Sequence, residues 1–450
     1  MSSALGTLRR DFGGGIIGPG SAEYESASRS LLASGHPARV LRPESVGDVQ
    51  AGVRFAARSG LLLSVRGGGH GFPGLGTNDG GVVIDLSKLA DVEIIDKERH
   101  LVRIGGGATW GQVAPALAPH GLAISSGDTK SVGVGGLTLT GGIGWKVRKY
   151  GLALDNVVAA EVVTANGEVV PASAGENPEL FWAIRGGGGN FGIAASLEYT
   201  LHQVGPMITG GLAAHPMQKG VEVLKFFRDL CAAAPDELMM FAGLLTAPDG
   251  SGAKLVGIVP AHCGSLADGE KAVAPIKAFG PPVMDVLGPI PYCAQNSLLE
   301  AAFPKGALNY WKSSFLTDLN DAAIQTLLEC FSACPSPMSQ IAIEHFHGKA
   351  SRIGIGDTAC ATRLTGFNVA IISQWMDPVE NDRHMTWCRD TYDALKPYFA
   401  QMRYLNYLDN DEPGDLAAVA YGPNYGRLRE LKTKYDPENF FHTNVNIRPL

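Results

Sequence analysis

The chain has few cysteines for its length, and their number does not suit a disulfide framework. All seven lie after residue 230 of the 450-residue sequence, and the count is odd. A chain of this size buries enough apolar surface to fold without disulfides, so we expect free thiols in a cytoplasmic protein. Cys330 and Cys334 are four residues apart and should share one face of a helix as small buried side chains, which we favour over a metal or redox pair.

Long apolar runs and basic clusters are also missing. No apolar run reaches the ~18 residues of a membrane-spanning helix, and residues 1–10 lack the apolar segment of a signal peptide. The net charge is −7 and basic clusters such as residues 146–149 are short, which argues against a nucleic-acid partner. We expect a protein that contacts neither membrane nor nucleic acid, and the sequence leaves its oligomeric state open.

Several common catalytic motifs are absent from the chain, which has no Walker A loop, no G-x-S-x-G and no H-E-x-x-H. His345 and His347 would share one face of a strand, but no third ligand can be placed, so we predict no metal site. A G-x-G-x-x-G match covers residues 69–74. No helix pattern opens after it, so the pyrophosphate site of a Rossmann unit is excluded.

Glycine, in contrast, is abundant: the chain has 58, most densely clustered in the first 200 residues. The first cluster, Arg66-Gly-Gly-Gly-His-Gly71, stands between two apolar runs that are typical of strands. Consecutive glycines let backbone N–H groups converge on an anion, usually a pyrophosphate, and His70 adds a nucleophilic ring beside it. The segment therefore predicts a dinucleotide cofactor, with a histidine placed for covalent attachment.

The spacing of apolar residues predicts two domains and a returning C-terminal segment. Ser45 should cap a helix over residues 46–59, which follows a first helix over residues 24–34. Asn166-Gly167 marks a β-hairpin. After Gln203 glycine thins out, and helices alternate with strands in an α+β pattern with a mostly antiparallel sheet. The predicted boundaries are 1–205 for the cofactor domain, 206–410 for the substrate domain and 411–450 for the returning segment.

Four glycine-rich segments and the C-terminal end together resemble the berberine-bridge-enzyme-like family of FAD-linked oxidases, which shares the fold of vanillyl-alcohol oxidase and 4-cresol methylhydroxylase. The matching segments are Arg66-Gly-Gly-Gly-His-Gly71, Val132-Gly-Val-Gly-Gly136 with Gly141-Gly142, Tyr150-Gly-Leu-Ala-Leu-Asp-Asn156, Phe181-Trp-Ala-Ile-Arg-Gly-Gly-Gly-Gly-Asn-Phe-Gly192, Tyr404-Leu-Asn-Tyr407, Tyr421-Gly-Pro-Asn-Tyr-Gly-Arg-Leu428 and Tyr435-Asp-Pro-Glu-Asn-Phe-Phe441. The resemblance implies an α+β protein with a two-part FAD-binding domain of vanillyl-alcohol-oxidase type and a separate substrate domain.

The resemblance also implies an FAD cofactor that is bonded covalently through His70 to the flavin 8α-methyl carbon. A bond of this kind usually raises the flavin potential, which helps the flavin to take a hydride from a reluctant donor. Other FAD-binding residues implied by the resemblance are Arg66, Gly67, Gly68, Gly69, Gly71, Gly127, Thr129, Val132, Gly133, Val134, Gly135, Gly136, Gly141, Gly142, Ile193, Asn444 and Asn446. For one or two of these glycines, a tight turn between strands is an alternative explanation.

Two departures from the family pattern bear on the chemistry. Relatives with a second, cysteinyl flavin bond carry cysteine in Gly-x-Cys-x-x-Val-Gly, and here Thr129 stands at that place, so the resemblance implies a single bond. Many relatives have paired tyrosines before the closing Asn-Tyr, and here Ala420 precedes Tyr421. Tyr421 is a candidate base, and aromatic packing between the domains explains it equally well.

Candidate substrate-binding residues come from the segment that resembles the family least. Gln340 and Glu344 lie on one face of a predicted strand, where Glu344 could anchor a cationic amine or take part in catalysis. The alternative is that this face meets solvent. Tyr404 is a further candidate for the substrate, and Tyr407 for catalysis.

The reaction that the resemblance implies removes a hydride from a C–H bond beside an amine or alcohol of a small organic substrate. Dioxygen is the expected acceptor and hydrogen peroxide the product. Val134 is small at the place where the family controls oxygen access, which favours an oxidase. Alternatives are a secondary-metabolite tailoring oxidase, an acceptor-dependent alcohol or sugar dehydrogenase and, in another class, a non-catalytic flavin-binding protein.

Overall fold

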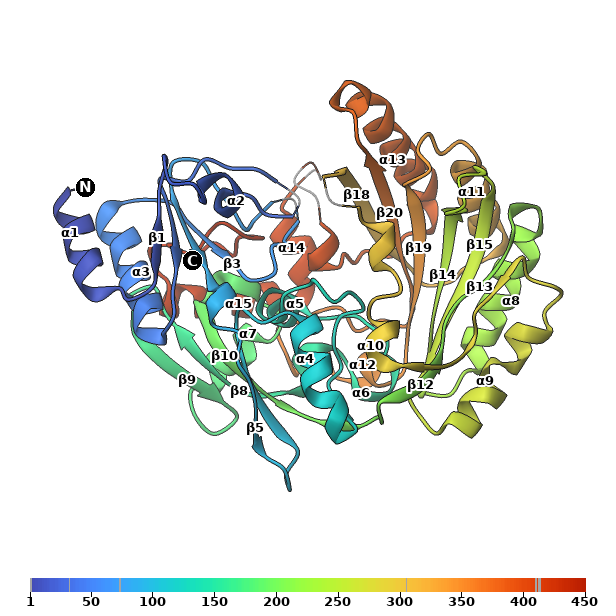
Figure 1. Cartoon of the computed structure of the whole chain (residues 1–450), viewed down its shortest axis with the longest axis horizontal. Coiled ribbons are helices and arrows are strands. Elements are labelled where there is room, and N and C mark those ends of the chain that lie inside the picture. Colours follow the sequence, from blue (N-terminus) through green and yellow to red (C-terminus); the bar gives the residue numbers. More distant parts are fainter. Residues whose placement is uncertain (1, 32, 73, 305, 409–410, 412–413) are drawn as a thin grey trace.

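Two β-rich lobes lie side by side in the computed structural model, with α5 and α14 in the region where they meet (Figure 1). The structure describes residues 2–31, 33–72, 74–304, 306–408, 411 and 414–450. Helices and mainly antiparallel sheets are mixed along the chain, which confirms the predicted α+β class. None of the helices in these ranges combines the length and the apolar character required to cross a membrane.

The first lobe opens with a four-stranded sheet in the order β1-β2-β4-β3, in which β2 and β3 both run parallel to β4. Its elements are α1 (Ser2–Asp11), β1 (Gly15–Ile17), α2 (Tyr24–Ser28), β2 (Arg39–Arg42), α3 (Val46–Ser59), β3 (Leu63–Arg66) and β4 (Val82–Asp85). The predicted cap of α3 is confirmed, because the Ser45 hydroxyl accepts a hydrogen bond from the backbone N–H of Asp48. The predicted helix over residues 24–34 is wrong. Arg29 is extended and pairs with Ser34, so α2 ends after five residues.

An antiparallel five-stranded sheet completes the first lobe in the order β5-β6-β10-β8-β9. Its strands are β5 (Val92–Asp96), β6 (Leu101–Gly105), β8 (Val157–Val163), β9 (Val169–Ser173) and β10 (Ile193–Thr200). The predicted hairpin at Asn166-Gly167 joins β8 to β9, with Gly167 at a φ of 75°, a left-handed conformation that glycine adopts without strain.

Short helices connect this sheet to the glycine-rich loops. They are α4 (Trp110–Leu117), α5 (Val134–Thr140), α6 (Val147–Tyr150) and α7 (Pro178–Ile184), and the short strands β7 (Leu122–Ala123) and β11 (His202–Gln203) pair nearby. The sequence does not predict α5, because glycine is among the poorest helix formers. This helix ends at Gly141, where φ is 150°.

A nine-stranded antiparallel sheet forms the second lobe. Its strands are β12 (Met207–Gly210), β13 (Ala213–Pro216), β14 (Leu238–Thr246), β15 (Lys254–His262), β16 (Met284–Asp285), β17 (Gly288–Pro291), β18 (Leu308–Leu316), β19 (Gln340–Phe346) and β20 (Gly366–Trp375). Helices α8 (Gly220–Ala233), α9 (Leu266–Ala278), α11 (Asp321–Ser332) and α13 (Asn381–Leu395) cover its outer face (Figure 1). The inner face, with α10 (Tyr292–Gln295) and α12 (Lys349–Arg352), turns toward the first lobe.

The seven cysteines are free thiols. The prediction that Cys330 and Cys334 share a helix face is wrong, because α11 ends at Ser332. Pro335 disfavours helical backbone at the residue before it, and the Lys254 ammonium takes up the carbonyls of Phe331 and Ser332 at the helix end.

The C-terminal segment returns to the first lobe through α14 (Leu416–Tyr421) and α15 (Tyr425–Tyr435). Lys432 on α15 is completely buried and donates to Asp436, to the carbonyl of Asn190 and to the carbonyl of Phe441. The Asn190 amide oxygen in turn accepts from the backbone N–H of Ile447. These bonds hold the last residues against the fourth glycine cluster, although the predicted domain boundaries themselves stay a prediction.

A buried ion pair joins the two lobes. The guanidinium of Arg363 reaches across from the segment before β20 and donates to both carboxylate oxygens of Asp155, at 2.7 and 2.8 Å. The side chains of both residues are almost inaccessible to solvent, at 4% and 2%. Breaking such a pair on one side leaves an uncompensated charge in the interior, which costs more than the intact pair contributes.

Arg363→Met should therefore lower the free energy of unfolding by ~3–5 kcal/mol, because Asp155 keeps its buried charge without a partner. Thermal denaturation of the purified variant beside the wild-type protein measures the loss. The double variant Asp155→Asn, Arg363→Met should recover part of it, since it removes the stranded charge. A single variant as stable as wild type would contradict the proposed importance of this ion pair.

Candidate functional site

Two glycine loops from distant parts of the sequence pack directly against each other. A Cβ atom added to Gly68 would lie 2.3 Å from the backbone nitrogen of Gly133 and 2.7 Å from the carbonyl oxygen of Ser131. Neither distance leaves room for a side chain, so the two backbones can approach this closely only where glycine is present. The contact brings the first glycine cluster, after β3, beside the N-terminal end of α5.

Backbone N–H groups in these two loops are left without acceptors. In the described residues, no hydrogen bond from protein to protein uses the N–H groups of Gly68, Gly69, His70, Gly71, Gly133, Gly135 and Gly136. Neighbouring N–H groups without partners form a concave, electropositive surface that binds anions such as pyrophosphate. The predicted phosphate-binding role of the glycines stays a prediction, and this geometry is what such a role requires.

Arg66, also predicted to bind the cofactor, is engaged by the protein itself. Its guanidinium is buried and donates to Asp85 and to the carbonyls of Ala27 and Arg29. These bonds fix the end of β3, so Arg66 holds the loop in place from behind.

His70 lies half-buried at the end of the first cluster. Its Nε2 is 3.0 Å from the hydroxyl of Ser131, and its Nδ1 has no partner in the part of the chain that is described. Burial lowers the pKa of His70 to about 4, although the carboxylate of Glu300 opposes the shift. That carboxylate is held by Lys130 at 2.7 Å. The imidazole is therefore neutral at physiological pH, with one ring nitrogen oriented by the protein and the other available as a nucleophile.

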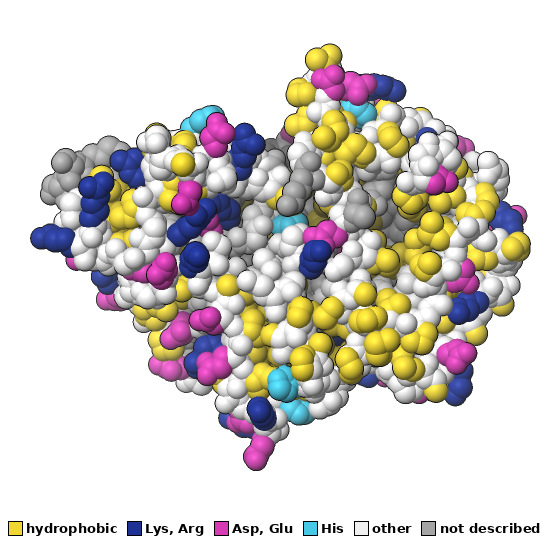
Figure 2. Space-filling view, in the orientation of Figure 1, with side chains coloured by type: hydrophobic (Ala, Val, Ile, Leu, Met, Phe, Trp, Pro, Cys, Tyr) yellow, Lys and Arg dark blue, Asp and Glu magenta, His cyan; other side chains and the backbone are white. Residues whose placement is uncertain are grey.

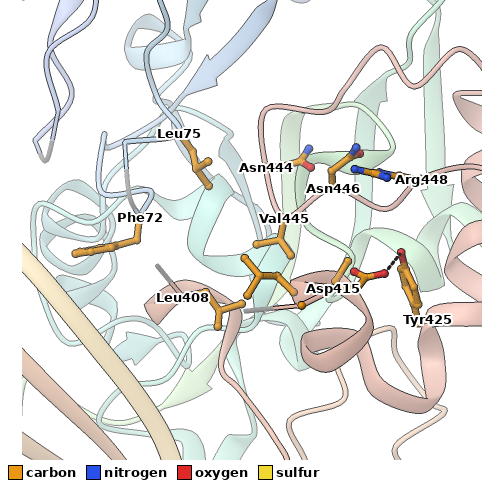
Figure 3. A pocket seen from close by; sticks show the side chains of 12 residues that line it. Phe72, Leu75, Leu408, Asp415, Tyr425, Asn444, Val445, Asn446 and Arg448 are labelled. Carbon is orange, nitrogen blue, oxygen red and sulfur yellow. Dashed lines mark hydrogen bonds between the residues drawn. The ribbon is translucent and has the colours of Figure 1, made fainter. Parts of the chain in front are cut away.

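A cavity of about 410 Å³ opens beside the first loop, between it and the C-terminal segment (Figure 3). Phe72 and Leu75 line one side, and Asn444 and Asn446 line the other. The side-chain oxygens of both asparagines are buried without a hydrogen-bond partner in the described chain. Buried polar atoms rarely remain unpaired, so these two oxygens are available to accept hydrogen bonds from a ligand in the cavity. Both residues were predicted to approach the flavin.

The candidate base Tyr421 is packed behind this cavity. Its hydroxyl is 3.1 Å from the carbonyl of Val445 and 3.3 Å from that of Gly187, and it accepts from Asn190 at 3.2 Å. Burial holds the pKa of Tyr421 far above its usual value. The phenol thus joins the fourth glycine cluster to the C-terminal segment. Its catalytic role stays a prediction that this geometry disfavours.

Tyr404 is also used by the scaffold. Its hydroxyl accepts hydrogen bonds from the backbone N–H groups of Gly142 at 2.8 Å and Ile143 at 3.2 Å, and its ring fills the space beside Gly141. Tyr404, predicted to bind the substrate, therefore contacts the predicted FAD-binding pair Gly141-Gly142 directly. Nearby, the Thr140 hydroxyl donates to Asn406.

The structure brings together two of the residues predicted for catalysis. The hydroxyl of Tyr407 donates to one carboxylate oxygen of Glu344 at 3.0 Å, and the amide of Asn368 donates to the other at 2.6 Å. Glu344 is 4% exposed. Burial, together with the negative charge of Asp128, raises the pKa of Glu344 to about 7. Near physiological pH both the protonated and the ionised form of Glu344 are therefore populated, as an acid–base group requires.

Asp128 is the acidic partner that sequence reasoning missed. It stands directly before Thr129, whose hydroxyl donates to it at 3.2 Å, and desolvation raises the pKa of Asp128 to about 6. The residue is partly exposed. A signal was present, since an acidic residue inside a predicted cofactor loop is unusual. Asn368 and Ser131 carried no comparable signal.

Aromatic rings connect the first loop to this acidic cluster. Trp311 on β18 lies 4.9 Å from Phe72, 5.6 Å from Phe303 and 6.1 Å from Tyr407, measured between ring centroids. Tyr407 in turn packs edge-on against Tyr404 at 5.2 Å. The rings thus form a continuous row of contacts from the loop that carries His70 to Tyr407, which bonds to Glu344.

The remaining predicted residues are buried or half-buried. Gln340 is half-buried on the same face of β19 as Glu344, because the two are four residues apart in a strand. Val134 and Ile193 are buried in apolar clusters, and Gly127 packs against Trp110. Val132 donates its backbone N–H to the carbonyl of Thr129. Their roles stay predictions.

The residues present fit a flavin dinucleotide better than a metal. Unpaired N–H groups suit the diphosphate, the cavity oxygens of Asn444 and Asn446 require donors, and His70 offers a free ring nitrogen. In the described ranges, no three His, Cys, Asp or Glu side chains are grouped so as to hold a metal ion. Lys and Arg side chains are scattered among acidic ones on the face drawn in Figure 2, which is hollowed between the lobes.

Comparison with known proteins agrees with this geometry. The family profile described as an FAD binding domain matches residues 37–173, and the profile described as berberine and berberine like matches residues 403–448. The (R)-6-hydroxynicotine oxidase of Paenarthrobacter nicotinovorans is 31% identical over 425 residues, which span 92% of this chain and 91% of that protein.

Two solved structures extend the comparison. 6-hydroxy-D-nicotine oxidase from Arthrobacter nicotinovorans superposes with a TM-score of 0.87 at 29% identity, covering 98% of each chain. Glucooligosaccharide oxidase from Acremonium strictum, which carries a 6-S-cysteinyl, 8α-N1-histidyl FAD, gives a TM-score of 0.87 at 25% identity, over 100% of this chain and 99% of that one. The predicted FAD-oxidase fold is therefore confirmed.

The raised pKa of Glu344 predicts a pH-dependent stability. Its value in the folded protein exceeds that of an exposed glutamate, so this group's stabilising contribution is present below pH ~4.5 and is lost as the pH rises through about 7. Glu344→Gln should therefore be more stable than wild type at pH 8, by about 1–3 kcal/mol, with little difference at pH 4.5. Glutamine fits if its oxygen faces Asn368 and its nitrogen faces Tyr407.

Thermal unfolding midpoints of both proteins between pH 4.5 and 8 measure this difference. Glu222→Gln, which neutralises an exposed carboxylate on α8, is the control and should follow wild type throughout. If the difference in unfolding midpoint between Glu344→Gln and wild type stays constant with pH, the raised pKa of Glu344 is contradicted.

Proposed function

Since the chain belongs to the berberine-bridge-enzyme-like family of FAD-linked oxidoreductases, we propose that it oxidises a small organic amine or alcohol at the C–H bond beside the heteroatom, with dioxygen as electron acceptor. The observation that carries the proposal is the pairing of a phosphate cradle with an acid–base cluster. Free N–H groups of the two glycine loops form the cradle, and Glu344 with Tyr407 forms the acid–base cluster.

The flavin, when bound, supplies the electron chemistry by accepting a hydride and returning electrons to dioxygen. The protein supplies binding, orientation and proton handling. In this proposal the N–H groups of Gly68, Gly69 and Gly133 hold the diphosphate without the entropy cost of ordering long side chains. Asn444 and Asn446 accept hydrogen bonds from the cofactor through their unpaired oxygens.

His70 is the proposed attachment point. Three features support it: the imidazole is neutral, its Nε2 is oriented by Ser131, and its Nδ1 is free. A neutral ring nitrogen is the nucleophile that bond formation to carbon requires. We propose a single covalent bond, because Thr129 stands where a second, cysteinyl attachment would need a thiolate, and an alcohol is far less nucleophilic.

Glu344 is the proposed acid–base residue, with Tyr407 as its orienting partner. An acid–base group works best when its pKa lies near the operating pH. Burial raises the pKa of the Glu344 carboxyl to about 7. Tyr421 is a positioning residue in this proposal, because its hydroxyl is committed to Gly187, Asn190 and Val445. Val134, buried at the start of α5, keeps its proposed role in admitting oxygen.

An oxygen-consumption screen tests the proposed function. Purified protein should consume dioxygen and form hydrogen peroxide with at least one of three donor sets: cyclic amines, secondary alcohols or oligosaccharides. Uptake with cyclic amines alone would match the nicotine oxidases. Flavin that is present but reduced by no donor would instead support the non-catalytic flavin-binding alternative, and a protein that stays colourless with added FAD would refute both.

His70→Ala should abolish the covalent bond to the flavin. Acid-precipitated wild-type protein should remain yellow, and its tryptic peptide containing residue 70 should carry the mass of the flavin, whereas the variant should release its flavin into the supernatant. His36→Ala, which removes an exposed histidine of the same lobe, is the control and should keep acid-stable flavin. Acid-stable flavin in His70→Ala would show that attachment occurs elsewhere.

Ser131→Ala should slow covalent attachment without preventing FAD binding. Loss of the hydroxyl leaves Nε2 of His70 without its partner, so the ring loses its preferred orientation while the glycine cradle stays intact. Incubation of apoprotein with FAD, sampled over time for acid-stable absorbance, measures the rate. Loss of this hydrogen bond should change the attachment rate by more than about twofold. A rate within about twofold of wild type would therefore remove Ser131 from the proposal.

A further inference from the structure

The acidic cluster formed by Asp128 and Glu344 contains more hydrogen-bond acceptors than donors. Glu344 receives bonds from Tyr407 and Asn368, and Asp128 receives one from Thr129. A carboxylate can accept about four hydrogen bonds, so most of the acceptor capacity of the two groups is unused. A ligand that occupies the cluster must therefore bring donors.

No cation of the described chain compensates these two carboxyls. Neither Asp128 nor Glu344 takes part in an ion pair among the described residues. Cations in neighbouring segments are engaged elsewhere: Lys130 pairs with Glu300, and Lys146 contacts the Tyr292 hydroxyl and lies over its ring at 3.6 Å. The negative charge of Asp128 opposes the ionisation of Glu344, so a positive partner would favour the ionised carboxylate, and the substrate can provide one.

A separate observation concerns an unpaired acceptor beside the same cluster. Asn368 is completely buried beside Glu344, and its side-chain oxygen has no hydrogen-bond donor in the described residues. The amide nitrogen of the same side chain is fixed on Glu344, so the oxygen cannot rotate away to find another partner without breaking that bond. An N–H group of a ligand would satisfy it.

Aromatic rings complete the surroundings of the cluster. The ring of Tyr407 bears the hydroxyl that contacts Glu344, and Trp311 lies 6.1 Å from it between centroids. Beyond Trp311, Phe72 continues the wall toward His70. Aromatic faces attract organic cations and stack on planar rings.

We propose that Asp128 and Glu344, with the side-chain oxygen of Asn368, bind the protonated nitrogen of an amine substrate, and that this cluster selects cyclic or aryl-substituted ammonium compounds over neutral alcohols and sugars. Asp128 is a specificity-determining residue in this scheme, and the ring of Trp311 contacts the apolar part of the substrate. The proposal rests on the proposed function in placing the substrate in the cleft beside the flavin.

The chemistry of the cluster agrees with this selectivity. Near neutral pH the two carboxyls together hold less than two negative charges, since burial raises the pKa values of both. A bound ammonium group favours their ionised forms and receives charge-assisted hydrogen bonds, which are about twice as strong as neutral ones. A neutral ether or alcohol provides neither effect, so it leaves the acidic pair uncompensated.

A matched ligand pair tests the proposal. Isothermal titration calorimetry under anaerobic conditions compares 4-phenylpiperidine, a secondary ammonium ion at pH 7.5, with 4-phenyltetrahydropyran, its neutral oxygen counterpart, on the flavin-loaded protein. Wild type should bind the amine at least about tenfold more tightly than the ether, the ratio expected for one charge-assisted hydrogen bond. Asp128→Asn and Glu344→Gln should each weaken amine binding about tenfold and leave ether binding within about twofold.

Glu222→Gln is the control for a general loss of negative charge and should bind both ligands as wild type does. Equal affinity of wild type for the two ligands, or wild-type amine affinity in both Asp128→Asn and Glu344→Gln, would overturn the proposal. If one variant does not fold, the ratio of amine to ether affinity in wild type and the affinities of the other variant still test the proposal. Flavin content and oxygen uptake report separately on the proposed function, so a yellow, oxygen-consuming protein without amine preference would refute the selectivity alone.

Discussion

The close approach of two backbones, at Gly68 and Gly133, is the constraint on which the site depends. At 2.3 Å from a hypothetical Cβ to a backbone nitrogen, no side chain fits at either position, and the N–H groups around the contact stay uncovered. The same approach places Ser131 against His70, so the anion cradle and the orientation of the imidazole have one structural origin. Arg66 fixes the first loop from outside the cradle through its bond to Asp85. Tyr404 fixes the segment that follows α5 by accepting from the N–H groups of residues 142 and 143.

Local patterns predicted the parts of this architecture that depend on neighbouring residues. The cap at Ser45, the hairpin at Asn166-Gly167 and the strand that carries Gln340 and Glu344 each follow from a few adjacent residues, and each is present in the structure. Predictions failed where a distant contact overrides local preference. Helix α5 forms from glycine-rich sequence because its first turn packs against the other loop, and α2 stops early because Arg29 pairs with Ser34.

Side-chain roles were harder to predict than positions. The sequence singled out Tyr404, Tyr407, Tyr421 and Glu344, yet nothing in it shows which hydroxyl faces another side chain and which faces the backbone. Tyr407 and Glu344 are 63 residues apart and meet only because η9 (Leu405–Tyr407) lies across the inner face of the sheet. Asp128 carried a local signal, but its interaction with Glu344 crosses between the lobes and cannot be read from the sequence.

The acidic cluster also explains why the lobes need a firm connection. Asp128 belongs to the first lobe and Glu344 to the second, so their like charges repel each other across the two lobes. Arg363 and Asp155 oppose that tendency with a buried, bidentate ion pair between the same lobes. In the proposed binding scheme, a cation that is shared between two like charges is held less firmly if the charges can move apart. The ion pair therefore acts on the site from outside it, because it holds together the two lobes that carry Asp128 and Glu344.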